Sequence, residues 1–136
     1  MTQTKKLGVL RVALILYAIL TLAYGIVYLF LPESYVASTG SEPIPAAWIR
    51  WIGGILIALG IAAIMIFRNP SKQGIFIFAS AIGTLITGLT DLYSLFFESV
   101  GDPWASLAPA IAILVLSALL WIGLFQAKTI LWNGEK

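Results

Sequence analysis

Four long apolar stretches dominate this sequence of 136 residues, and the short segments between them carry most of the charges and prolines. The stretches cover residues 12–31, 46–67, 73–97 and 104–127. A helix needs about 20 mostly apolar residues to cross a bilayer, and inside lipid only helices and closed β-barrels satisfy their own backbone. The alternation typical of barrel strands is absent. The sequence therefore predicts an all-α, polytopic membrane protein.

Chain-breaking residues between the stretches indicate where the helices end. They are Pro32, then Gly40, Pro43 and Pro45, then Asn69 and Pro70, and finally Gly101 and Pro103. We expect one domain over residues 1–136, an up-down bundle of four transmembrane helices at about 7–32, 46–67, 73–97 and 104–130. A cleaved signal peptide is the alternative for the first stretch, but its apolar run exceeds the about 7–15 residues of such signals.

Composition removes several classes of function. Charged residues make up 10% of the chain, whereas soluble domains have about a quarter. The chain has no cysteine and no histidine, which removes thiol chemistry, imidazole or thiolate metal sites and Ser–His or Cys–His catalysis. The basic residues are scattered singly, so nucleic-acid binding is not expected. No catalytic residue, metal site or cofactor is predicted, apart from a bound lipid or quinone.

The basic residues predict the orientation of the chain in the membrane. Seven of the eight fall on one side of the predicted bundle: Lys5, Lys6, Arg11, Arg68, Lys72, Lys128 and Lys136. Only Arg50 falls on the other side. Because basic residues concentrate on the cytoplasmic side, we expect a multi-pass membrane protein with both termini cytoplasmic.

The third stretch carries polar residues on one helical face. Ser80, Thr84, Thr87, Asp91 and Ser94 recur at spacings of four, three, four and three. One interpretation is a close helix–helix contact, with hydroxyls bonding across it or back to the i−4 carbonyl. The other is one wall of a polar crevice.

The first stretch has a matching face. Tyr17, Thr21, Tyr24 and Tyr28 follow spacings of four, three and four. A phenol that points into lipid near the midplane lacks a hydrogen-bond partner, so burial against another helix is favoured. Packing inside the bundle and a ligand-lining role are both open at this point.

Arg50 and Asp91 are expected at similar depth. At 1.5 Å per residue they lie about 10 Å and 9 Å from the centres of their segments, both toward the outer face. An ion pair between the second and third helices would offset the insertion cost of each charge. For Arg50 the alternative is a side chain that snorkels outward between Trp48 and Trp51.

The second stretch is rich in small residues. Gly54, Ala58 and Ala62 share one face, and Gly53 and Gly60 lie on the adjoining edge. Small residues let the backbones of membrane helices approach closely, so this helix is predicted to pack tightly.

The segments LRVALILYAILTLAYGIVYLFLP (10–32) and WIRWIGGILIALGIAAI (48–64) resemble the DoxX-like group of small bacterial four-helix membrane proteins. The matching features are Arg11, Gly25 ahead of a proline end, Arg50 followed by Gly53 and Gly54, and the Leu59-Gly60 pair. The second half matches only in architecture. The resemblance implies an accessory subunit of the bacterial inner (cytoplasmic) membrane, in some cases beside oxidoreductase or sulfur-metabolism systems, and it implies no catalytic residues.

Three hypotheses about function follow. The leading one is a non-enzymatic accessory or binding protein that holds a lipid, a quinone or a partner helix. Its site would be a seam formed by Tyr17, Tyr24, Tyr28, Arg50, Thr87 and Asp91. The second is a small dimeric transporter or channel that uses Asp91. The third is an intramembrane enzyme that uses Asp91 with a tyrosine. Membrane lipids, a membrane-protein partner or a second copy of the chain are the expected partners.

Overall fold

The computed structural model describes residues 3–39, 44–97 and 103–134, and it confirms an all-α bundle with four long helices. The helices are α1 (Gln3–Phe30), α2 (Pro32–Thr39), α3 (Ala46–Arg68), α4 (Gly74–Phe97), α5 (Pro103–Gln126) and α6 (Lys128–Asn133). Each long helix contains a segment long and apolar enough to cross a membrane: Leu7–Phe30, Ala46–Arg68, Gly74–Phe97 and Leu107–Gln126. The chain is therefore a multi-pass membrane protein.

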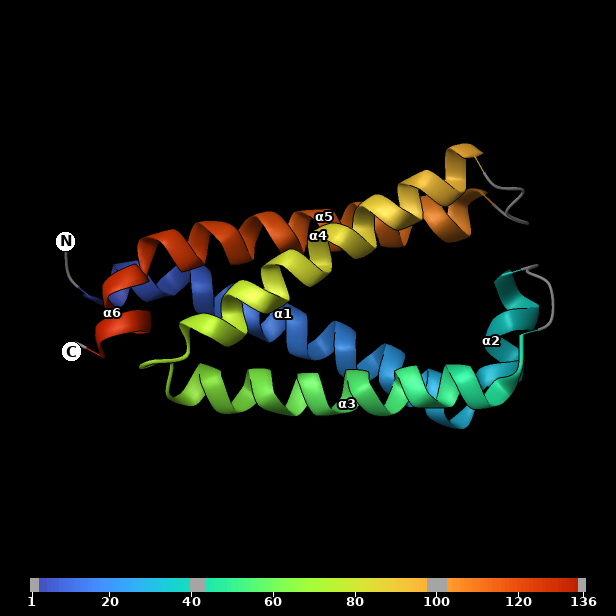
Figure 1. Ribbon diagram of the computed structural model, residues 1–136, viewed down its shortest axis with the longest axis horizontal. Helices are drawn as coiled ribbons and strands as arrows, with labels where there is room; N and C mark the ends of the chain where they lie inside the picture. Colours follow the sequence, from blue (N-terminus) through green and yellow to red (C-terminus); the bar gives the residue numbers. More distant parts are fainter. Residues whose placement is uncertain (1–2, 40–43, 98–102, 135–136) are drawn as a thin grey trace.

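The long helices are arranged as two antiparallel pairs, α1 with α3 and α4 with α5 (Figure 1). Helix α1 also packs against α5 and so joins the pairs, whereas α3 and α4 do not pack along each other over the ranges that the structure describes. The pairs converge at the end where both termini lie and diverge toward the opposite end (Figure 1). The bundle is closed at one end and splayed at the other.

The hydrophobic core fills the closed end. Its fully buried members include Leu10 and Leu14 of α1, Ile77 of α4 and Leu120 of α5. Helix α6 folds back onto this end and buries Leu131 in the same cluster. The hydroxyl of Ser117 donates a hydrogen bond to the carbonyl oxygen of Ala81, 3.0 Å away, and so ties α5 to α4 within the core.

Glycines set how closely α1 approaches its two neighbours. A methyl group on Gly53 would lie 2.8 Å from the backbone nitrogen of Leu29 and 2.9 Å from the carbonyl oxygen of Gly25. On the other side of α1, a methyl group on Gly123 would lie 2.8 Å from the Cα of Leu10. Helix α1 therefore meets both neighbours backbone to backbone, as small residues allow between membrane helices.

The contact face of α3 differs from the face that small residues alone suggested. Gly53 and Gly60 are buried against α1. Gly54 and Ala58 are exposed, and no atom outside its own stretch of helix lies within 4 Å of a methyl group built on Gly54. The edge with Gly53 and Gly60 is the packing surface because it is in register with the other buried positions of the helix, such as Ile49 and Ala63.

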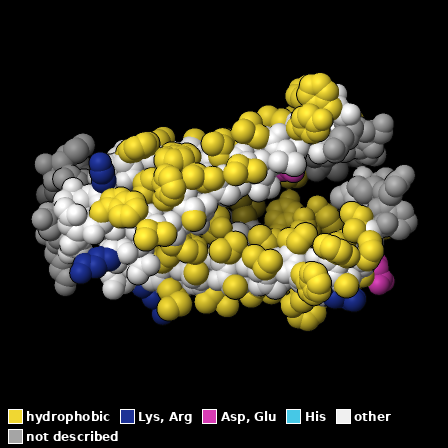
Figure 2. All heavy atoms as spheres, in the orientation of Figure 1, with side chains coloured by type: hydrophobic (Ala, Val, Ile, Leu, Met, Phe, Trp, Pro, Cys, Tyr) yellow, Lys and Arg dark blue, Asp and Glu magenta, His cyan; other side chains and the backbone are white. Residues whose placement is uncertain are grey.

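The outer surface of the bundle is apolar along most of its length, and most of the Lys and Arg side chains visible in Figure 2 lie toward the end with the termini. Large hydrophobic side chains remain exposed on every long helix, for example Ile19, Ile55, Ile86 and Ile111, each at least half exposed. Such a surface suits lipid rather than water.

Two features of the chain path depart from the expected helices. Pro32 begins a short helix, α2, which turns away from α1. Proline suits this first helical position because no backbone N–H is needed there. The last helix stops at Gln126, and α6 starts after a break at Ala127. Pro109 lies inside α5.

Replacing Gly53 with alanine should destabilise the protein by about 1–3 kcal/mol, because the added methyl overlaps two backbone atoms of α1 that cannot move independently. The matched control is Gly54→Ala one residue away, which meets open space and should be neutral or up to about 1 kcal/mol stabilising through helix propensity. Thermal unfolding in detergent, followed by circular dichroism, measures both. Equal behaviour of the two variants would contradict the close contact between α1 and α3.

Candidate functional site

A cavity of about 710 Å³ lies between the two helix pairs, in the splayed half of the bundle. Helix α1 forms its back, α3 and α4 flank it, and α2 and α5 complete the wall. The hollow is visible from the side, between α3 below and α4 above, in Figure 2. Because α3 and α4 do not pack along each other where the chain is described, the cavity opens sideways toward the membrane.

The wall of the cavity contains both polar and apolar side chains. Helices α1, α2 and α4 supply the polar side chains: Tyr17, Thr21, Tyr24, Tyr28, Tyr35, Thr39, Ser80, Thr84, Thr87 and Asp91. Helices α3 and α5 supply apolar residues, Ile49, Ile52, Leu56, Leu59, Pro109, Ile113 and Leu116, and Leu20 of α1 and Phe76 of α4 add to them. The cavity is therefore amphipathic, with polar groups that a head group can bind and apolar surface that a hydrocarbon chain can cover.

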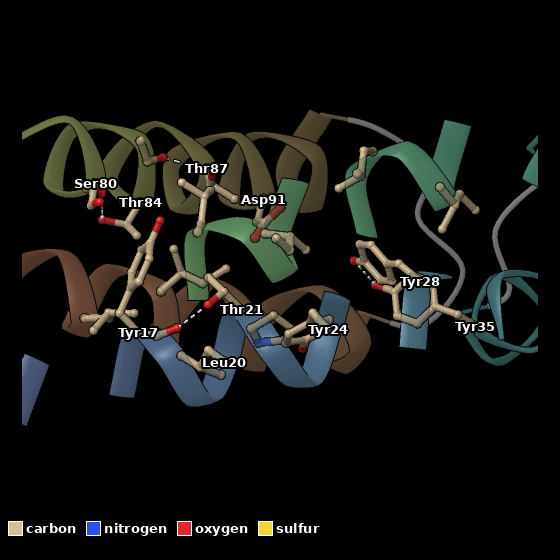
Figure 3. Close-up of a pocket in the computed structure, with 18 of the residues that line it drawn as sticks. Tyr17, Leu20, Thr21, Tyr24, Tyr28, Tyr35, Ser80, Thr84, Thr87 and Asp91 are labelled. Atoms are coloured by element: carbon tan, nitrogen blue, oxygen red, sulfur yellow. Dashed lines mark hydrogen bonds between the residues drawn. The ribbon is translucent and has the colours of Figure 1, made fainter. Parts of the chain in front are cut away.

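Three tyrosines form a cluster at the outer end of the cavity, which is the end toward the splayed end of the bundle. The hydroxyl of Tyr28 on α1 lies 3.1 Å from that of Tyr35 on α2, at hydrogen-bond distance (Figure 3). Their ring centroids are 4.6 Å apart, and the centroid of Tyr24 is 5.7 Å from Tyr28 and 6.5 Å from Tyr35. The steep angles between Tyr24 and the other two rings make these contacts edge-to-face, the arrangement that aromatic quadrupoles favour.

Tyr17 lies deeper in the cavity, one helical turn below Thr21. Its ring is buried and packs edge-on against Phe76 of α4, with centroids 6.5 Å apart. Its hydroxyl is directed at the polar face of α4, toward Ser80 and Thr84 (Figure 3). Tyr17 thus closes the inner end of the cavity, where the hydrophobic core begins.

The threonines in the wall all bond to their own helices. Thr84 donates to the carbonyl of Ser80 at 2.8 Å, Thr87 to that of Gly83 at 2.9 Å, and Thr21 to that of Tyr17 at 2.7 Å. These bonds fit either of the two interpretations of the polar face of α4. The cavity decides between them, because Ser80, Thr84, Thr87 and Asp91 all line it. A methyl group on Gly83 would meet no atom of the described residues within 4 Å beyond its own stretch of helix.

Asp91 extends from α4 into the cavity near its outer end (Figure 3). The side chain is partly buried, and its carboxylate accepts no hydrogen bond from any residue that the structure describes. Tyr24 and Tyr28 lie within electrostatic reach of it. A carboxylate held in this way keeps its oxygens available to a bound molecule.

The structure does not bring Arg50 to Asp91, so the expected ion pair between them is not formed. Arg50 is exposed on α3 beside Trp48 and Trp51, is absent from the cavity wall, and makes no ion pair with Asp91 within the described ranges. The expectation assumed that helices consecutive in sequence are neighbours in space. Helix α3 instead packs on α1, and α4 packs on α5, which leaves the cavity between them. The exposed position fits the alternative of an arginine that snorkels between tryptophans.

Five of the six predicted site residues thus line one cavity: Tyr17, Tyr24, Tyr28, Thr87 and Asp91. Sequence reasoning missed Tyr35 and the apolar walls from α3 and α5. Tyr35 follows Tyr28 by seven residues, the spacing of one helical face, but Pro32 between them was interpreted only as a helix end. Ile52, Leu56 and Leu59 carry no local signal, because such residues serve equally well in a core or against lipid.

The described residues contain no group of three or more His, Cys, Asp or Glu side chains that could hold a metal ion. Among the described residues, the cavity wall offers one carboxylate, several hydroxyls and aromatic rings.

Because the chain has no cysteine, single cysteines can report which positions of α4 face water. A cysteine at Thr87 should react with a water-soluble maleimide in membranes, since it faces the cavity. A cysteine at Ile86, exposed on the outer surface of the same helix, should react far more slowly because it faces lipid, and one at fully buried Ala81 should not react. Equal labelling at residues 86 and 87 would show that the cavity holds no water.

In comparisons with known proteins, no family model, no curated protein and no solved structure matches this chain. A proposal about function therefore rests on the chemistry of the cavity and on the resemblance seen in the sequence.

Proposed function

We propose that this protein is a non-enzymatic membrane protein that binds a lipophilic molecule, of the kind of a lipid or a quinone, in the cavity between its helix pairs. The observation that carries the proposal is the amphipathic cavity that opens sideways between α3 and α4. A molecule dissolved in the bilayer reaches such a site without crossing water, and few polar groups then suffice to orient it.

The closed end of the bundle supports binding rather than passage. Beneath Tyr17, the side chains of Leu14, Ile77 and Leu120 are fully buried and continuous with the core. A molecule that enters from the splayed end stops there. A cavity with a packed floor suits retention of a ligand.

The setting of this proposal is the bacterial inner membrane, with both termini in the cytoplasm and the splayed half toward the outside. The distribution of Lys and Arg supports this orientation, because seven of the eight lie on the side of the termini. The resemblance of residues 10–32 and 48–64 to the DoxX-like group supports an accessory role beside other membrane proteins.

A small transporter, working as a dimer, is the second candidate. The observation that favours it is Asp91, an acidic side chain in a cavity within a membrane, where ionisable groups commonly mark ion or substrate pathways. For a transporter, this structure would be the conformation that is open to the outside. Transport would also require the helices at the closed end to separate.

Narrowing the cavity should weaken ligand retention without unfolding the protein. Gly83→Leu points a new side chain into the cavity, where a Cβ meets no neighbour, while Gly54→Leu adds the same side chain to the outer surface. Native mass spectrometry from nanodiscs should show a retained lipophile with the wild type and Gly54→Leu, and at least a tenfold lower occupancy with Gly83→Leu. Unchanged occupancy in Gly83→Leu, or none in the wild type, would refute the proposal.

Proteoliposome flux distinguishes the second candidate from the first. For a binding protein we expect no solute flux above that of empty liposomes, because the core closes the inner half of the bundle. Solute-dependent flux that Asp91→Asn abolishes and Arg50→Gln leaves unchanged would establish the transporter instead.

A further inference from the structure

We propose that the cavity selects lipophilic organic cations, of the ammonium or phosphonium class, with Asp91 as their counter-ion and Tyr24, Tyr28 and Tyr35 as an aromatic wall. This inference rests on the proposed function and specifies the head group that the site accepts. It favours a cation over a quinone or an anionic lipid.

The threonine hydroxyls of the wall are hydrogen-bond acceptors toward the cavity. A threonine hydroxyl has a single proton, and those of Thr21, Thr84 and Thr87 are committed to main-chain carbonyl oxygens, which can only accept. The lone pairs of these three oxygens are what remains for a ligand. A quinone carbonyl or a phosphate, each itself an acceptor, finds no free proton on these three threonines and is left with the tyrosine phenols as donors, whereas a positively charged group is attracted to the threonine lone pairs.

Asp91 gives the cavity its charge. It is the single charged side chain in the cavity wall as far as the described residues extend, and the arginine expected beside it lies elsewhere, exposed on α3. A carboxylate in a partly water-excluded site without a counter-ion attracts cations strongly, because the low local dielectric weakens screening. The same charge repels the phosphate of an anionic lipid.

The tyrosine cluster adds a second attraction for a cation beside Asp91. Tyrosine rings carry negative charge on their faces, and a cation within about 6 Å of a ring centroid is stabilised. Three rings whose centroids lie 4.6–6.5 Å apart are concentrated at the outer end of the cavity, and two of them, Tyr24 and Tyr28, lie within electrostatic reach of the Asp91 carboxylate. Quaternary cations, which have no N–H to donate, are recognised by such aromatic surfaces.

The apolar wall explains why the cation should also be lipophilic. Ile52, Leu56 and Leu59 of α3 and Ile113 and Leu116 of α5 line the cavity beside its polar groups. A small inorganic cation leaves this surface uncovered and gains nothing from it. Organic substituents on the cation cover this apolar surface, and each Å² of apolar area removed from water contributes about 25 cal/mol of favourable binding free energy.

Charge selectivity tests the inference with two probes of similar size and shape, tetraphenylphosphonium and tetraphenylborate. Each is titrated separately into protein in nanodiscs, with protein-free nanodiscs subtracted, and decylubiquinone is tested as a competitor. We expect saturable binding of the phosphonium, no saturable binding of the borate and no displacement by the quinone. Asp91→Asn should weaken phosphonium binding about tenfold or more, as loss of a partly buried charge partner does. Asp91→Glu should retain it, and Arg50→Gln should leave it unchanged.

Equal binding of the two ions, preference for the borate, or displacement by the quinone would overturn the cation inference and leave lipophile binding supported. The wild-type comparison needs no variant, so a folding defect in Asp91→Asn cannot obscure it. If neither ion nor the quinone binds saturably and no lipophile is retained on purification, the proposed function itself fails.

Discussion

The structure depends on how closely α1 approaches its two neighbours. In lipid the hydrophobic effect does not drive helices together, so association relies on dense packing and on hydrogen bonds between helices. Gly53 on α3 and Gly123 on α5 allow backbone contact on two sides of α1, which makes α1 the element that holds both pairs together. Because α1 occupies the centre, α3 and α4 need not touch along their described lengths, and the space between them becomes the cavity.

The second constraint is that polar groups inside a membrane need partners. The threonines of α1 and α4 meet this requirement locally by bonding to their own i−4 carbonyls, so they need no neighbouring helix. Ser117 meets it across the core, through the carbonyl of Ala81. This division has a functional consequence. A helix face whose hydroxyls are already satisfied can line a cavity at little cost, and the lone pairs that remain are directed to the cavity as acceptors.

Much of the fold could be predicted because it follows from periodicity and length. The four spans and the faces with Tyr17, Tyr24 and Tyr28 or with Thr87 and Asp91 depend only on spacing along each helix. The pairing of helices could not be predicted, because a glycine face fits any close neighbour. The Arg50–Asp91 hypothesis depended on that pairing, and Tyr35 depended on the direction in which α2 leaves Pro32. In both cases the missing information was the relation between elements rather than the elements themselves.

The distribution of packing along the bundle argues for a binding protein over an open channel. A continuous path would have to pass the level of Leu10, Leu14, Ile77 and Leu120, side chains with essentially no exposed surface. Helix α6 adds a second layer, because Leu131 is fully buried in the same cluster and the ring of Trp132 lies within 3 Å of where a methyl group on Gly74 would be. Opening such a floor exposes several large apolar side chains at once, at about 1.5–3 kcal/mol for each one that meets water. The splayed half, by contrast, is already open, so a ligand that enters from the bilayer binds without that cost.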